Sequence, residues 1–234
     1  MISVIPIAGV PEVTPGAVLA DLLLAALAAQ GTALEDGDCL VVTQKVVSKA
    51  EGRLVELDPR DPAARQALIE SESTRILRRR GDLVIAETRG GLVCANAGVD
   101  VSNVDEGWAA LLPIDPDRSA RRIRDRVRAK AGAEVAVVVS DTFGRPWRLG
   151  LVDVAIGLAG LAAVVDLRGK PDQRGRPLQV TEVALADEVA SAAELVMGKA
   201  RGIPAAVVRG LDPAWLGDGS AADLVRPHGE DLFR

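Results

Sequence analysis

Residues 137–150 read VVVSDTFGRPWRLG, the strongest single indication of fold and chemistry in the chain. The β-branched apolar run predicts a buried strand, and Asp141-Thr142 at its end predicts the rim of a site. Asp141 offers a hard oxygen ligand for a divalent cation, and Thr142 can add a hydroxyl oxygen. The guanidinium groups of Arg145 and Arg148 can clamp carboxylate or phosphate oxygens. Such a site would suit phosphoryl chemistry. The alternative is a strand-to-turn corner with solvated arginines.

The length and composition predict that residues 1–234 form one globular unit, either a single large domain or two intertwined small ones. The sequence has 48% hydrophobic and 26% charged residues, which is enough apolar material for a packed core. The net charge of −5 and a pI near 5.1 argue against a protein that binds nucleic acid through bulk positive charge. Aromatic residues make up 2% and Tyr is absent, so a base-stacking surface is not expected either.

Cysteine usage and apolar run lengths indicate a cytoplasmic protein. Cys39 and Cys94 lie in apolar, strand-like runs, as buried free thiols of a reducing compartment do. The N-terminus lacks the pattern of a secretory signal peptide. The longest apolar stretch, around residues 17–29, contains Asp21 and is too short to span a bilayer. We therefore expect no membrane partner.

The chain has a single histidine, His228, in a polar tail. Ser-His-Asp and Cys-His mechanisms are excluded unless this tail folds back onto the site. Carboxylates, lysines and arginines must then carry the chemistry.

Predicted helices and strands alternate without a regular βαβ repeat. Asp and Thr residues followed by Pro predict helix starts, and Gly residues predict helix ends. The helices expected on this basis span residues 14–31, 61–80, 115–132 and 184–197. Strands are expected at residues 1–8, 82–87, 92–95 and 204–209, and residues 39–47 mix strand and polar-turn character. This order predicts an α+β fold with mixed or antiparallel sheets and packed helices.

Two further polar segments follow apolar strand-like runs. Lys45 and Lys49 share a face if their segment is helical, and their ammonium groups could contact phosphate. In residues 96–103, Gly98 permits close approach of a ligand, while Asp100 and Asn103 could hold metal and nucleotide. The alternatives are a solvated lysine pair and an Asx-rich turn.

Asp100 and Asp141 each follow an apolar strand run, and two converging carboxylates would make a divalent-metal site that bridges phosphates. The loop at residues 9–13 could cradle a nucleotide with its backbone. The sequence contains neither GxxxxGK[ST] nor GxGxxG, so any nucleotide binds outside those two schemes.

Taken in order, these segments resemble the coenzyme F420-0:L-glutamate ligase family, the gamma-glutamyl ligases of coenzyme F420 biosynthesis. The matching blocks cover nearly the whole chain, and their order is more specific than any one block. They read GVPE at 9–12, KVVSKAEGR at 45–53, NAGVDVSN at 96–103, SDTFGRPWRLG at 140–150, ADE at 186–188 and IPAAVVRG at 203–210.

The resemblance implies a two-lobed α+β unit that forms an intertwined homodimer, here as a standalone bacterial-type member. It implies a ligase that uses GTP, with Mg²⁺ or Mn²⁺ and a monovalent ion, K⁺. This ligase would join L-glutamate to the carboxylate of the deazaflavin precursor F420-0 through an acyl phosphate, and then add successive gamma-linked glutamates.

The resemblance also implies roles for individual residues. Metal would be held by Asp100, Asp141 and Thr142. Catalysis would depend on Asp141, Lys49, Arg145 and Arg148. GTP would be contacted by Val10, Pro11, Glu12, Val13, Gln44, Lys49, Asn103, Met197 and Gly198.

One departure from the family pattern concerns a second metal ion. Archaeal-type members carry a glutamate after Met-Gly on a late loop, where this chain has Lys199. A charged lysine cannot ligate a cation, so the geometry of a second metal is open. Two other functions also stay open: a non-catalytic GTP or metal sensor on the same scaffold, and a kinase that forms the acyl phosphate without ligation.

Overall fold

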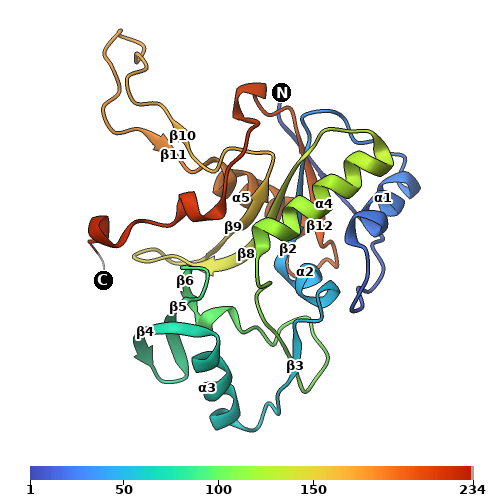
Figure 1. The fold of residues 1–234 in the computed structure, drawn as a ribbon, viewed down its shortest axis with the longest axis vertical. Helices are drawn as coiled ribbons and strands as arrows, with labels where there is room; N and C mark the ends of the chain where they lie inside the picture. The colour runs from blue at the N-terminus through green and yellow to red at the C-terminus, as the bar shows by residue number, and fades with distance from the viewer. Residues whose placement is uncertain (233–234) are drawn as a thin grey trace.

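The computed structural model describes residues 1–232, and a five-stranded sheet forms its centre (Figure 1). The strand order is β1-β12-β2-β8-β9, in which only β2 and β8 run parallel. The strands are β1 (Ser3–Pro6), β2 (Cys39–Thr43), β8 (Ala136–Gly144), β9 (Leu151–Ala159) and β12 (Ala205–Arg209). The prediction of mixed sheets with packed helices is therefore confirmed.

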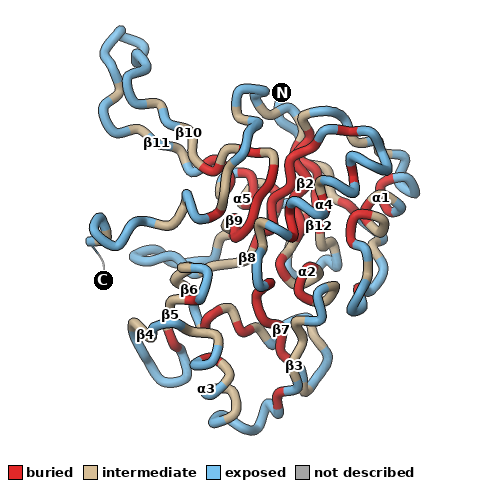
Figure 2. The backbone as a smooth tube through the Cα atoms, in the orientation of Figure 1, coloured by how far each residue is buried: buried red, intermediate tan, exposed pale blue. Residues whose placement is uncertain are grey.

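Helices cover both faces of this sheet, which explains why β2 and β8 read as continuous apolar runs. Along β8, Val137 and Val139 share a core with α1 (Leu19–Ala29) and α4 (Pro116–Ala131). Val138 faces the other way, into a core with α5 (Leu185–Met197). The deepest burial in the molecule accordingly runs along these strands (Figure 2).

Helix α4 forms as its sequence predicts. The Asp115 carboxylate accepts a hydrogen bond from the Arg118 N–H, Pro116 occupies the first turn, and Gly132 ends the helix in the left-handed region. The helix α5 also matches its predicted span to within one residue.

The rest of the chain from residue 54 to residue 110 builds smaller sheets with a core of their own. β3 (Leu54–Glu56) pairs with β7 (Trp108–Ala110), and β5 (Leu83–Thr88) lies between β4 (Ser73–Arg80) and β6 (Val93–Ala95). The strands predicted at residues 82–87 and 92–95 are confirmed, and they pair as an antiparallel hairpin in which the Thr88 N–H donates to the Leu92 carbonyl at 2.8 Å.

The predicted helix over residues 61–80 is wrong in its second half. Helix α3 (Pro62–Ser71) starts at the Asp61 cap as expected, but residues 73–80 form strand β4. Arg79 in this strand pairs with Glu70 of α3 at 2.7 Å. Long-range pairing with β5 therefore overrides the local signal.

The first helix is also shorter than predicted, since α1 begins at Leu19 and not at Thr14. Gly16 has a φ of +83°, which interrupts any helix there, and its N–H donates to the Ala50 carbonyl at 2.8 Å. Residues 39–47, expected to mix strand and turn, divide into β2 and a short helix, α2 (Gln44–Ala50). Lys45 and Lys49 consequently lie one turn apart on a helix.

The remaining elements are short. A two-stranded arm of β10 (Val165–Asp166) and β11 (Glu182–Val183), with the loop between them, projects from the body (Figure 1). Single turns of 3-10 helix lie at Asn96–Gly98, Pro213–Trp215, Ala221–Leu224 and His228–Glu230.

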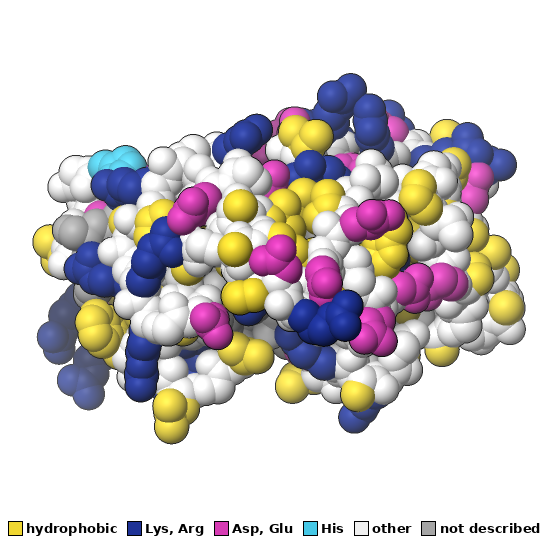
Figure 3. All heavy atoms as spheres, turned by 90° about the horizontal axis from the view of Figure 1, so that it is seen from below, with side chains coloured by type: hydrophobic (Ala, Val, Ile, Leu, Met, Phe, Trp, Pro, Cys, Tyr) yellow, Lys and Arg dark blue, Asp and Glu magenta, His cyan; other side chains and the backbone are white. Residues whose placement is uncertain are grey.

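The face that contains the smaller sheets carries interspersed basic and acidic side chains (Figure 3). In residues 1–232, no helix has the length and apolar character needed to cross a bilayer.

Candidate functional site

A pocket of about 520 Å³ opens where β8 runs on past the carboxyl end of β2. Its walls come from the 10–13 loop, the start of α2, the middle of β8, and the end of α5 with the segment after it. It brings together most of the residues expected from the sequence to bind nucleotide or metal. These are Val10, Pro11, Glu12, Val13, Gln44, Lys49, Asn103, Asp141, Thr142, Met197 and Gly198.

Asp141 does not end its strand, as the sequence suggested, because β8 continues to Gly144 and pairs with β9 throughout. Its carboxylate accepts the Thr142 N–H at 2.8 Å. Burial raises the pKa of Asp141 to about 6, although the Thr142 N–H and the Lys45 ammonium oppose the shift. Asp141 is thus a half-buried carboxylate on the wall of the pocket, and it would ionise more readily beside a cation.

Asp100 reaches this region through Lys45. The Lys45 Nζ lies 2.6 Å from Asp100 Oδ2. Burial raises the pKa of Asp100, but the Lys45 ammonium and the Ser102 N–H outweigh it, so the pKa lies below its ordinary value. Asp100 does not end a strand, since it follows a 3-10 turn and bridges Ala110. Asp100 is not among the described residues that line the pocket.

The donor set fits a Mg²⁺ or Mn²⁺ ion that keeps most of its coordination for water and phosphate. In residues 1–232, no three His, Cys, Asp or Glu side chains converge into a complete metal cage. Asp141 nevertheless presents a carboxylate oxygen without a protein donor in this part of the chain, next to Thr142. Mg²⁺ is commonly held by one or two carboxylates together with substrate phosphates.

Asp153 was missed from the sequence, although it lies at the centre of the site. It is 3% exposed and accepts hydrogen bonds from Ser140 Oγ at 3.0 Å and Thr142 Oγ1 at 2.7 Å. It therefore fixes the Thr142 side chain. The available signal was an acidic residue between Val152 and Val154 in a strand that is otherwise apolar.

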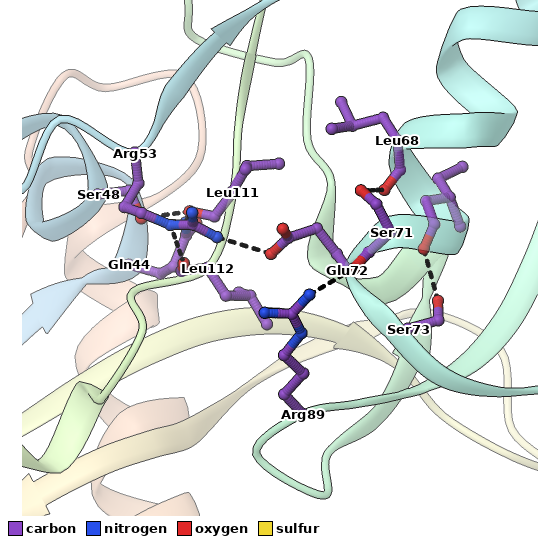
Figure 4. Close-up of polar contacts among 11 residues, drawn as sticks. Gln44, Ser48, Arg53, Leu68, Ser71, Glu72, Ser73, Arg89, Leu111 and Leu112 are labelled. Carbon is purple, nitrogen blue, oxygen red and sulfur yellow. Dashed lines mark hydrogen bonds and ion pairs between the residues drawn. The ribbon is translucent and has the colours of Figure 1, made fainter.

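Lys49 and Gln44 line the pocket from α2. Lys49 forms an ion pair with Glu12, and its side chain is only 14% exposed, against 77% for Glu12. Gln44 donates through Nε2 to Ser48 Oγ at 2.7 Å and to the Leu111 carbonyl at 3.0 Å (Figure 4). Its Oε1 is buried without a partner in the described structure, so this oxygen can accept one further hydrogen bond.

Arg145 and Arg148 lie away from the pocket, in the exposed turn between β8 and β9. Arg145 Nη2 donates to the Leu149 carbonyl at 2.5 Å. In this conformation, neither guanidinium reaches Asp141 or Thr142 by a hydrogen bond.

The end of α5 closes the opposite wall. Met197 is buried, Gly198 has a φ of +58°, and Glu194 and Lys199 also line the pocket. Burial and the Asp153 carboxylate raise the pKa of Glu194, while Lys199 and Arg201 lower it by a smaller amount. Lys199 therefore adds positive charge to the wall where the archaeal-type pattern has a glutamate.

Comparisons with known proteins identify the family of this chain. The family model described as F420-0:Gamma-glutamyl ligase matches residues 9–210. A protein of Methanothermobacter thermautotrophicus, named Coenzyme F420:L-glutamate ligase, is 44% identical over 100% of this chain and 99% of its own length. A protein of the same name from Methanopyrus kandleri is 44% identical over 95% and 94% of the two chains. A third, from Archaeoglobus fulgidus, is 41% identical over 100% and 96%. The chain belongs to the F420-0:gamma-glutamyl ligase family.

Proposed function

We propose that this chain is a GTP-dependent ligase that joins L-glutamate to the carboxylate of F420-0 and then adds further gamma-linked glutamates. One observation carries the proposal. A single pocket collects the half-buried Asp141 carboxylate, the Thr142 hydroxyl and the Lys49 ammonium beside the 10–13 loop. The names of the 41–44% identical relatives give the substrates, F420 and L-glutamate.

The chemistry requires activation because a carboxylate has no good leaving group. In the proposed first step, an F420-0 carboxylate oxygen attacks the γ-phosphorus of GTP, the bond to the β-phosphate oxygen breaks, and GDP leaves. In the second step, the glutamate amine attacks the acyl carbon, the C–O bond breaks, and phosphate leaves with that oxygen. The amine loses a proton as the amide forms.

The residues of the pocket serve alignment and charge neutralisation more than proton transfer. Lys49 would hold a phosphate oxygen, and the free Gln44 Oε1 would accept an N–H of the nucleotide. Asp153 would fix the orientation of the Thr142 hydroxyl by accepting its hydrogen bond. Mg²⁺ or Mn²⁺, held by Asp141 and Thr142, would neutralise phosphate charge when bound.

We also propose the two-lobed, intertwined homodimer that the family resemblance implies. The cores on the two faces of the central sheet contain none of the residues of the core around Ile69 and Val84, which supports a second lobe. The β10–β11 arm projects into solvent with Val180 83% exposed, and Leu149 is 95% exposed on the β8–β9 turn. These apolar groups would be covered by a second copy.

The two free thiols, Cys39 and Cys94, support a cytoplasmic location.

The deciding experiment measures GDP release from GTP with F420-0 and L-glutamate supplied separately and together, with Mg²⁺ or Mn²⁺ and with or without K⁺. A ligase releases GDP in step with glutamylated product only when both substrates are present. GDP release with F420-0 alone, unchanged by glutamate, would identify an acyl-phosphate kinase. GTP binding with no release under any condition would identify a sensor.

A further inference from the structure

A second cavity, of about 390 Å³, lies between the smaller sheets and the central sheet. It shares no lining residue with the nucleotide pocket, and it includes no residue assigned above to GTP, metal or catalysis. Its apolar walls come from four separate parts of the fold. They include Leu92, Ala97, Leu112, Pro113, Ile156 and Ala221.

One residue that lines this cavity carries a buried polar atom without a partner in the described structure. Thr88 lines it, is 5% exposed, and has a hydroxyl Oγ1 with no hydrogen-bond partner in the described structure. Native proteins rarely leave a buried hydroxyl unpaired, because its lost hydration is then not replaced. A polar atom of a bound molecule would satisfy it.

Two arginines supply unused donors at the same cavity (Figure 4). Arg53 donates through Nε to the Leu112 carbonyl at 3.0 Å and through Nη2 to Glu72 at 2.6 Å. Arg89 donates through Nη2 to the Ser71 carbonyl at 3.1 Å. Within residues 1–232, Arg53 Nη1 and the Nε and Nη1 of Arg89 have no acceptor. These N–H groups form part of a fork that suits carboxylate or phosphate oxygens.

The acidic side chains around the cavity are already engaged. Glu72 pairs with Arg53, and Asp115 accepts the Arg118 N–H at 2.9 Å. Asp117 accepts the Leu158 N–H at 2.8 Å and the Ser220 hydroxyl at 2.7 Å. Each of these three carboxylates already accepts at least one hydrogen bond from the protein, so the N–H groups of Arg53 and Arg89 that lack an acceptor are the groups that an anionic ligand would complement.

We propose that this cavity is a second small-molecule site, which takes an organic oxyanion: a carboxylate or phosphate carried on an apolar body. The apolar body packs against Leu112 and Ile156, and the oxyanion binds the free N–H groups of Arg53 and Arg89. The Thr88 hydroxyl pairs with a polar atom of the same molecule. This inference does not depend on the proposed ligase activity, because it uses none of the residues of the nucleotide pocket.

Titration calorimetry with three probes of matched shape tests the proposal. Naphthoate and naphthyl phosphate carry the oxyanion, whereas naphthamide presents the same ring without charge. We expect one molecule of an anionic probe to bind per chain, both with and without saturating GTP and Mg²⁺. Naphthamide should bind at least about tenfold more weakly. The tighter of the two anions identifies the head group.

Two substitutions test whether the probes bind in this cavity. Arg89→Gln and Thr88→Val should each weaken the anionic probe by about tenfold. Thr88→Val should leave the melting temperature unchanged or higher, because it removes an unpaired buried hydroxyl. Arg78→Gln is the matched control, since Arg78 lies outside the cavity and, within residues 1–232, donates only to the Leu77 carbonyl.

The proposal is overturned if neither anion binds at about 10 mM, a concentration that detects millimolar affinity. It is also overturned if naphthamide binds as tightly as the anions, or if both cavity variants bind them as wild type does.

Discussion

The Lys45 ammonium lies 2.6 Å from the Asp100 carboxylate, and its charge also opposes the rise that burial causes in the pKa of Asp141. The sequence suggested that these two carboxylates share one divalent cation. In the structure, the Lys45 ammonium already pairs with Asp100, whereas Asp141 and Thr142 lie on the pocket wall, where we propose that they hold the cation. Lys45 was recognised in the sequence as a phosphate contact, but its partner came from a segment 55 residues away, beyond the reach of any local pattern.

Replacing Lys45 with methionine should strengthen divalent-metal binding to the nucleotide-free protein. The change removes one positive charge beside Asp141 and keeps most of the buried stem. At pH 8, Mn²⁺ should bind about five- to tenfold more tightly, which corresponds to about 1 to 1.4 kcal/mol. A Mn²⁺ titration followed by electron paramagnetic resonance measures this. An unchanged or weaker affinity would place the metal away from Asp141.

Metal binding should depend on pH through Asp141. Burial raises its pKa to about 6 in the folded chain from an ordinary 3.8, so the folded state binds this proton more tightly than the unfolded state. The group therefore stabilises the metal-free fold below about pH 4, and that contribution is lost as the pH rises through about 6. Because a cation binds the ionised form, Mg²⁺ affinity should rise over the same interval.

Asp141→Asn is the control for this titration, since it removes the ionisable group and keeps the shape. In the variant, the contribution of this group to the pH dependence of stability and of Mg²⁺ affinity should disappear. Glutamate-dependent turnover should fall by at least about a hundredfold. Calorimetric titrations at pH 5, 6 and 8 with wild type and variant check the first point. Near-normal turnover of the variant at saturating Mg²⁺ would remove Asp141 from the metal site.

Lys49→Met should weaken GTP binding by at least about tenfold, because a charge-assisted contact to phosphate is lost. The fold should lose less than about 1 kcal/mol, since the partner that remains, Glu12, is largely exposed to water. Glu12→Gln breaks the same ion pair but keeps the lysine, and it separates the two roles. If both variants bind GTP as wild type does while melting normally, Lys49 is only a structural lysine.

Lys199→Glu should strengthen Mn²⁺ binding in the presence of GDP and shorten the glutamyl tails of the product. The substitution replaces a cation on the pocket wall with an oxygen ligand, and it repels a tail whose negative charge grows with each addition. Lys199→Gln removes the charge without adding a ligand. Mass spectrometry of the products compares the three proteins, and identical tail lengths with identical Mn²⁺ titrations would mean that Lys199 is a solvated loop residue.

Local signals predicted much of the fold. The apolar run of β8 and the caps of α4 depend on residues adjacent in the sequence, and both elements formed where expected. Strand β4 was not predictable in this way, because its pairing with β5 decides its conformation. The candidate site divides similarly. Ordered blocks of sequence located most of the pocket wall, whereas Asp153 acquires its place only through contacts to Ser140 and Thr142.

The most direct test of the account follows one oxygen atom. F420-0 labelled with ¹⁸O in its carboxylate is incubated with GTP, Mg²⁺, L-glutamate and the enzyme, and the released phosphate is analysed by mass spectrometry. If an acyl phosphate forms in this pocket, each phosphate carries one ¹⁸O from the carboxylate for every amide bond made. Glutamylated product accompanied by unlabelled phosphate, or no product in the presence of GTP, would contradict the proposed ligase mechanism.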